Sequence, residues 1–128
     1  MEANKQSILC VDDNEDNLEL ITYVFEEKGF EVTICNSLEN CLPQIYENKF
    51  TAVILDNWFR GGTSLEVCQK IRSFSPDIPI IFYSAEVRIT EIEKAFEAGA
   101  NSYLTKPEDF DKLAETVSVL IRESQVQV

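Results

Sequence analysis

The sequence predicts a doubly wound α/β fold, in which a five-stranded parallel sheet is covered by helices on both faces. Short apolar runs alternate with longer amphipathic stretches along the chain, which indicates five β–α units in succession. The runs at 52–55 and 78–82 are apolar at nearly every position, as expected of parallel strands buried on both faces. The chain has 128 residues, of which 45% are hydrophobic, so we expect residues 1–128 to form one domain with 125–128 as a frayed tail.

Each element of the first two units has a local signal. The strands are expected at 7–11 and 31–35, and the helices at about 15–28 and 38–48. Asn14 is placed to cap the first helix, and Gly29 to stop it. Pro43 falls inside the second helical stretch and cannot supply a backbone N–H. We therefore expect that helix to start late or to kink.

The remaining three units follow the same alternation. The strands are expected at 52–56, 78–83 and 102–105, and the helices at about 63–74, 87–98 and 109–124. The third helix opens with Thr63-Ser64-Leu65-Glu66, which has the spacing of a capping box. Gly99 follows the fourth helix and is suited to end it. The fifth helix carries Leu113 and Val117 on one apolar face.

The net charge excludes some classes of partner. With 23 acidic and 11 basic residues the charge is −12, which argues against non-specific binding to nucleic acid or to an anionic membrane. The N-terminal residues are polar, and no apolar stretch approaches the length of a membrane span. We expect no signal peptide and a cytoplasmic protein.

The four cysteines do not suggest a metal site. They show no CxxC spacing, and the chain has no histidine, so zinc is disfavoured and buried or half-buried reduced thiols are expected. A disulfide between Cys35 and Cys41 has no support in the sequence.

Polar and charged side chains follow four of the five expected strands. The functional crevice of an open parallel sheet lies beyond the carboxyl ends of its strands. The residues at these ends are Asp12 and Asp13 after the first strand, Asp56 at the end of the third, Ser84 after the fourth and Lys106 after the fifth. Singly, each is typical of a helix cap, a turn or a solvated surface, but their joint occurrence predicts a site.

The composition of this cluster indicates its chemistry. Three neighbouring carboxylates repel one another and need cations. Lys106 supplies one, and a hard divalent ion such as Mg²⁺, held by carboxylate oxygens, a carbonyl and waters, would supply the other. The absence of histidine excludes a Ser–His triad, and Gly61-Gly62 lacks the Gly-Lys-Ser/Thr continuation of a phosphate-binding loop. A carboxylate beside a metal, a lysine and a hydroxyl suits phosphoryl transfer to aspartate.

These residues resemble the receiver domains of two-component response regulators, the CheY-like family. The resemblance covers nearly the whole chain. The motifs that carry it are Val11-Asp12-Asp13-Asn14, Ile54-Leu55-Asp56, Ser84-Ala85, Ala98-Gly99-Ala100 and Tyr103-Leu104-Thr105-Lys106-Pro107. It implies a flavodoxin-like (βα)5 topology with strand order 2-1-3-4-5.

The resemblance also implies a role for each residue of the site. Asp56 would accept the phosphoryl group of a histidine kinase or phosphotransfer protein, in a reaction that needs Mg²⁺. The metal would be held by Asp12 and, more directly, by Asp13, Asp56 and the backbone carbonyl of Trp58. Lys106 and Ser84 would contact the phosphoryl oxygens.

The resemblance further implies how the signal leaves the site. Tyr103 would turn inward as Ser84 moves, and the face made by the fourth helix, fifth strand and fifth helix would then bind a protein partner. The Lys106–Pro107 bond is similar to the family's cis peptide. Such a domain is a switch rather than an enzyme, with self-phosphorylation and slow self-dephosphorylation as its reactions.

The loop after Asp56 departs from the family pattern. The family usually has proline four residues and glycine eight residues after the phosphoacceptor, and here these positions are Arg60 and Ser64. The aromatic residues Trp58 and Phe59 are either packed against a neighbouring helix or functional. As a hypothesis, Trp58 shields the aspartyl phosphate from water.

Three other classes of protein share this fold or this chemistry. A haloacid-dehalogenase-like phosphatase would need an Asp-x-Asp motif after a strand, which Asp56-Asn57-Trp58 lacks. A flavodoxin-like electron carrier would need a phosphate loop where the chain has Asp12 and Asp13. An interaction module that does not depend on phosphorylation stays open. So do the cognate kinase, the output target, and the choice between a stand-alone regulator, a phosphorelay intermediate and a piece of a longer protein.

Overall fold

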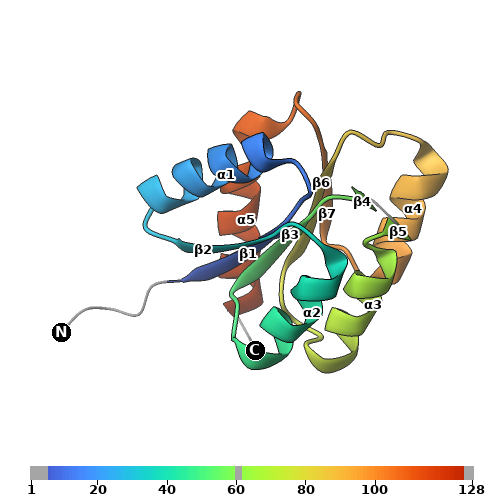
Figure 1. The fold of residues 1–128 in the computed structure, drawn as a ribbon, viewed down its shortest axis with the longest axis horizontal. Coiled ribbons are helices and arrows are strands. Elements are labelled where there is room, and N and C mark those ends of the chain that lie inside the picture. The colour runs from blue at the N-terminus through green and yellow to red at the C-terminus, as the bar shows by residue number, and fades with distance from the viewer. Residues whose placement is uncertain (1–5, 60–61, 126–128) are drawn as a thin grey trace.

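The structure is a computed structural model that describes residues 6–59 and 62–125. Five long strands form the central sheet (Figure 1): β1 Ser7–Val11, β2 Glu31–Cys35, β3 Ala52–Leu55, β6 Ile80–Ser84 and β7 Ser102–Thr105. The helices are α1 Glu15–Glu27, α2 Leu38–Glu47, α3 Leu65–Phe74, α4 Ile89–Ala98 and α5 Phe110–Gln125. A short hairpin, β4 Trp58–Phe59 and β5 Gly62–Thr63, lies between β3 and α3.

The order of the strands in the sheet is β2-β1-β3-β6-β7, and all four pairings are parallel. Numbered along the chain without the hairpin, this is the expected order 2-1-3-4-5. Because the strands are parallel, their carboxyl ends share one edge. The predicted fold class is therefore confirmed.

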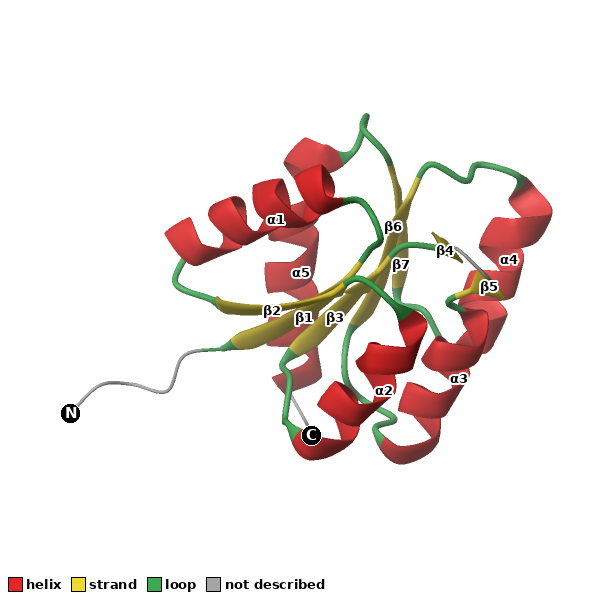
Figure 2. Cartoon of the chain, viewed as in Figure 1, coloured by secondary structure: helices red, strands yellow, loops and turns green. Residues whose placement is uncertain are grey.

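Helices cover both faces of the sheet (Figure 2). Helices α1 and α5 lie on one face, and α2, α3 and α4 lie on the other. Alternate residues of β1 serve the two sides, since side chains alternate along a strand: Ile8 and Cys10 pack toward α1 and α5, whereas Leu9 and Val11 pack toward α2 and α3. All four are fully buried, which explains why the strand is apolar without alternation.

Three local expectations about caps and breakers had different outcomes. Asn14 caps α1 as expected, with its side chain accepting a hydrogen bond from the backbone N–H of Asn17 (3.0 Å). The expectation that α2 starts late was wrong, because the helix begins at Leu38 with Ser37 as its cap and Pro43 lies inside it. The strand expected from residue 78 begins at Ile80, after Pro79, which has no N–H for the sheet.

The predicted capping box of α3 was also wrong. Ser64 is the N-cap residue, but its side chain makes no capping hydrogen bond. The Ser64 hydroxyl instead donates to the backbone carbonyl of Asp56. The hydroxyl of Thr63 takes part at the helix start by accepting from the N–H of Leu65 (3.3 Å). Helix α3 thus begins one residue later than a box capped by Thr63 would place it, and the hydroxyl of its N-cap residue donates to a residue outside the helix.

The cysteines agree with the expectation of buried or half-buried reduced thiols. All four cysteines are free and buried. Burial raises the pKa of the Cys41 thiol to about 12 and that of Cys68 to about 11, which keeps both thiols protonated near neutral pH. No helix of the described residues is long and apolar enough to cross a membrane. Gln125, expected in a frayed tail, is the last residue of α5, and 126–128 lie outside the described residues.

Candidate functional site

The backbone of the sheet places the site residues at its carboxyl edge. The N–H of Asp12 donates to the carbonyl of Cys35 (3.1 Å), and the N–H of Asp56 donates to the carbonyl of Val11 (3.0 Å). The N–H of Lys106 likewise donates to the carbonyl of Ser84 (2.9 Å). The residues that follow the strands are therefore still held by strand-like hydrogen bonds, so their side chains start from fixed positions. The Lys106–Pro107 peptide bond is cis, as expected.

Lys106 joins two of the predicted carboxylates. Its Nζ lies 2.6 Å from Asp12 Oδ2 and 3.2 Å from Asp56 Oδ2. The side chains of Lys106, Asp12 and Asp56 are 13%, 3% and 12% exposed, so water screens these ion pairs little. Residues from the ends of β1, β3 and β7 thus meet in one buried ionic cluster.

The electrostatics of the cluster show its unbalanced charge. Burial raises the pKa of the Asp56 carboxyl above its ordinary value; Lys106 lowers it, and the neighbouring Asp12 raises it further. Burial alone lowers the pKa of Lys106, but its contacts with Asp12 and Asp56 outweigh this effect and hold the pKa above the ordinary value. Lys106 therefore stays charged, and the ionised form of Asp56 carries a cost that a further cation would relieve.

The third carboxylate completes a donor set for a cation. Oxygens of Asp12, Asp13 and Asp56 all lie within 4.8 Å of one another. Asp12 already accepts hydrogen bonds from Lys106 and, through Oδ1, from the N–H of Asn14 (2.9 Å). Asp13 is exposed to solvent. Three carboxylates beside one ammonium group leave excess negative charge, so the residues present fit a hard, oxygen-preferring divalent cation.

Ser84 lies at the end of β6 beside this cluster. It is 1% exposed, and its hydroxyl oxygen accepts a hydrogen bond from the N–H of Glu86 (3.2 Å). A hydrogen bond with Ser84 also lowers the pKa of the Asp56 carboxyl, and this effect is smaller than those of burial, Lys106 and Asp12. The predicted hydroxyl is thus on the same edge as the phosphoacceptor candidate.

Tyr103 lies in β7 with its ring along the sheet. The ring stacks on that of Phe82, with centroids 5.8 Å apart and planes 8° apart. Its hydroxyl donates to the backbone carbonyl of Glu86 (2.9 Å) and accepts from the side-chain amide of Asn57 (3.3 Å). The ring is therefore tied to the loop after β6 and to the loop after β3.

The Trp58 side chain is bound to the loop that follows β6. Its side chain is exposed, and its indole Nε1 donates to Glu86 Oε1 (2.8 Å). Glu86 also accepts from the Arg88 guanidinium, at 2.7 and 2.9 Å, and this pair lowers the pKa of Glu86 to about 2. The loop after Asp56 is thereby linked to the loop after β6. Arg60, the other departure of this loop, lies outside the described residues.

Three residues of this edge were missed from the sequence. Ser64 binds the carbonyl of Asp56, Asn57 binds Tyr103, and Glu86 binds Trp58 through its side chain and Tyr103 through its carbonyl. A signal existed for two of them: Ser64 stands where the family usually has glycine, and Asn57 is a polar residue beside Asp56. Glu86 had no signal, since an acidic residue in a loop is common.

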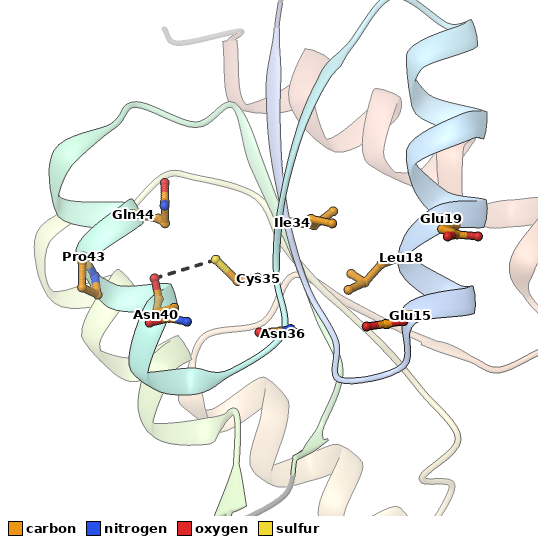
Figure 3. Close-up of a pocket in the computed structure, with 9 residues that line it drawn as sticks. All are labelled: Glu15, Leu18, Glu19, Ile34, Cys35, Asn36, Asn40, Pro43 and Gln44. Atoms are coloured by element: carbon orange, nitrogen blue, oxygen red, sulfur yellow. Dashed lines mark hydrogen bonds between the residues drawn. The ribbon is translucent and has the colours of Figure 1, made fainter.

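A groove beside β2 is lined by none of the residues of this cluster. It has a volume of about 490 Å³ and lies between α1, the edge strand β2 and α2 (Figure 3). Leu18 and Ile34 face each other on its α1 side, and the Cys35 thiol contacts the carbonyl of Asn40 (3.7 Å) on its α2 side. None of its lining residues was predicted for the site.

The comparisons with known proteins agree with this geometry. A doubly wound domain with an acidic, lysine-containing edge is the class that the fold and the site define. The family model described as the response regulator receiver domain matches residues 8–118, and the chain belongs to this family. It is a receiver of two-component signalling.

Individual relatives support the assignment. The chain is 28% identical over 126 residues to the transcriptional regulatory protein ZraR of Klebsiella oxytoca, which covers 98% of this chain and 28% of that protein. A two-component response regulator from Clostridium difficile matches with a TM-score of 0.89 and 26% identity, over 94% of this chain and 99% of that one. The response regulator TrrA of Thermotoga maritima, in complex with Mg²⁺ and BeF, matches with a TM-score of 0.81 and 31% identity, over 90% and 98% of the two chains. The chain thus spans about a quarter of the length of ZraR.

Proposed function

We propose that this receiver accepts a phosphoryl group on Asp56 from the phosphohistidine of a sensor histidine kinase or phosphotransfer protein, in a Mg²⁺-dependent reaction. The observation that carries the proposal is the contact of Lys106 with both Asp12 and Asp56, beside the exposed carboxylate of Asp13. Asp13, Asp56 and the backbone carbonyl of Trp58 would hold the metal, with Asp12 supporting it. When bound, Mg²⁺ supplies positive charge that balances the incoming phosphoryl oxygens.

The residues of the chain then have separate parts in the transfer. A carboxylate oxygen of Asp56 attacks phosphorus, the P–N bond to the donor histidine breaks, and the electron pair of that bond returns to the imidazole. Lys106 is already within hydrogen-bonding distance of Asp56 and neutralises charge that arrives on the phosphoryl oxygens. Ser84 would donate its hydroxyl proton to one of them, and this proton is free because the Ser84 oxygen only accepts a hydrogen bond from the N–H of Glu86.

The signal would leave through the face formed by α4, β7 and α5. Tyr103 belongs to β7 and is tied to the Ser84 side of the site through the backbone of Glu86. Phosphorylation would bias this face between two packings, and a protein partner would bind one of them. The exposed apolar side chains of Val87, Ile89 and Phe96 lie in or just before α4 and suit a protein partner. The charge of −12 favours such a partner over nucleic acid or membrane, and we place the chain in the cytoplasm as a switch without turnover of its own.

Intact mass after incubation with acetyl phosphate tests the proposal. The wild-type chain should gain one base-labile phosphoryl group with Mg²⁺ and none when the metal is chelated, and Asp56→Asn should gain none. Asp111→Asn, which changes an acidic residue in the first turn of α5, is the matched control and should react as the wild type does. An adduct on Asp56→Asn, or none on the wild type with this donor or a phosphorylated phosphotransfer protein, would favour an interaction module that does not depend on phosphorylation.

A further inference from the structure

Asn57 is a buried amide with an incomplete set of hydrogen bonds. It directly follows Asp56, and it is 1% exposed. Its Nδ2 donates to the hydroxyl of Tyr103 (3.3 Å). Within the described part of the chain, Asn57 Oδ1 is the one buried side-chain oxygen or nitrogen that has no partner. Such atoms are rare in folded proteins and call for a reason.

The direction of the hydrogen bonds is determined by chemistry. The backbone carbonyl of Glu86 can only accept, so the Tyr103 hydroxyl must use its proton to donate to it (2.9 Å). The hydroxyl oxygen then has only lone pairs left, so it can only accept from Asn57, and Asn57 must donate through its side-chain N–H₂ group. The amide is therefore held with its nitrogen toward Tyr103, and its oxygen is left without a partner as a consequence.

This arrangement favours one position of Tyr103 over any other. In the structure Tyr103 is inward: it packs against the core cluster, its ring stacks on Phe82, and its hydroxyl binds both Asn57 and Glu86. If the ring turned outward, Asn57 Nδ2 would lose its partner and the whole buried amide would be without hydrogen bonds. An apolar residue at this position would carry no such penalty, because it has nothing to leave unpaired.

We propose that Asn57 is a positioning residue that holds Tyr103 inward before any phosphoryl group is present. The inference rests on the proposed function, since Tyr103 is the switch residue of that proposal. Asn57 adjoins the phosphoacceptor in sequence, and Glu86, which completes the contact, donates its N–H to Ser84. The face of α4, β7 and α5 is accordingly biased toward one packing in the unphosphorylated protein. Phosphorylation therefore changes the populations of the two packings less than it would without Asn57.

Fluorine NMR of the full chain labelled with 3-fluorotyrosine tests this, without Mg²⁺ or any phosphoryl donor. The Tyr103 resonance is assigned by its loss in Tyr103→Phe. Asn57→Leu should lower the ratio of inward to outward Tyr103 by about five- to hundredfold, the range expected from leaving buried polar atoms unpaired. The resonance of Tyr83 is the internal control and should not move, because its ring packs against Phe110 on the opposite face of the sheet. An unchanged Tyr103 resonance in Asn57→Leu overturns the proposal.

A double-mutant cycle separates positioning from packing. If Asn57 acts through the hydroxyl of Tyr103, Asn57→Leu should cost less free energy of unfolding in the Tyr103→Phe background than in the wild type. Equal costs in both backgrounds would mean a packing role and would also overturn the proposal. Should Asn57→Leu not fold, Asn57→Ser, whose side chain is too short to reach Tyr103, takes its place in both measurements.

The same samples distinguish this inference from the proposed function. Beryllofluoride with Mg²⁺ is then added as a phosphoryl analogue, and it should return Tyr103 of Asn57→Leu toward the inward resonance. Failure of the wild type to bind beryllofluoride would contradict phosphoryl acceptance at Asp56. It would leave the effect of Asn57 intact, because that effect is measured before the analogue is added.

Discussion

Replacing Lys106 by methionine leaves Asp12 and Asp56 without the ammonium group that lies 2.6 and 3.2 Å from their carboxylate oxygens. At an effective dielectric constant of about 20, each of these contacts is an attraction of about 5–6 kcal/mol. The burial of the lysine charge offsets a large part of this gain. Removing one partner of a buried pair typically costs about 3–5 kcal/mol, and we expect the free energy of unfolding of Lys106→Met to fall by this amount without Mg²⁺.

Urea unfolding followed by circular dichroism measures this loss, with Lys112→Met as the matched control. Lys112 Nζ lies 3.4 Å from Asp109 Oδ1, but its side chain is 72% exposed, so this change should cost less than about 1 kcal/mol. Excess Mg²⁺ should recover part of the loss in Lys106→Met, because a bound cation restores the missing positive charge. If the two variants lost equal stability in the absence of Mg²⁺, the reasoning from burial and charge would be refuted.

Three further predictions concern the loops around the site. Trp58→Ala should shorten the half-life of the aspartyl phosphate severalfold, as followed by intact mass, and an unchanged half-life would contradict shielding by the indole. The pKa of Glu86 is lowered to about 2 from 4.5, so its contribution to stability is present above about pH 4.5 and is lost as the pH falls toward 2. The difference in free energy of unfolding between the wild type and Glu86→Gln should therefore shrink over this interval. A difference that grows on acidification would contradict the lowered pKa of Glu86. Gly99→Ala should cost more than about 2 kcal/mol, because Gly99 has a φ of +119° and an added Cβ would collide with the side chain of Arg72; in an Arg72→Ala background the cost should fall to the backbone part alone.

Much of the fold could be predicted because its signals are local or periodic. The alternation of apolar runs with amphipathic stretches indicated the five strands of the sheet and the five helices, with bounds that differ from the structure by about two residues at most. The carboxyl edge followed from topology, since parallel strands end on one side of the sheet. Asp12, Asp56 and Lys106 could thus be placed together although Lys106 is 94 positions from Asp12 in the chain.

The failures have two physical causes. The capping-box pattern places Thr63 at the N-cap, but the structure places Ser64 there, and the hydroxyl of Ser64 donates to the carbonyl of Asp56. A local pattern cannot show that the carbonyl of a residue at the end of β3 lies within reach of this hydroxyl. The hairpin of β4 and β5 was missed because each of its strands has two residues, too few to show periodicity.

The sequence by itself determined the order of the elements, the composition of the acidic cluster and the family to which these belong. The tertiary structure decided how the loops around that cluster are connected: Asn57 meets Tyr103 from 46 positions away, and Trp58 meets Glu86 from 28 positions away. Such contacts depend on the direction in which each side chain leaves its loop and on which donor faces which acceptor. Apolar periodicity carries no information about either, so the resting position of the switch could be inferred only once the strands and loops were placed in space.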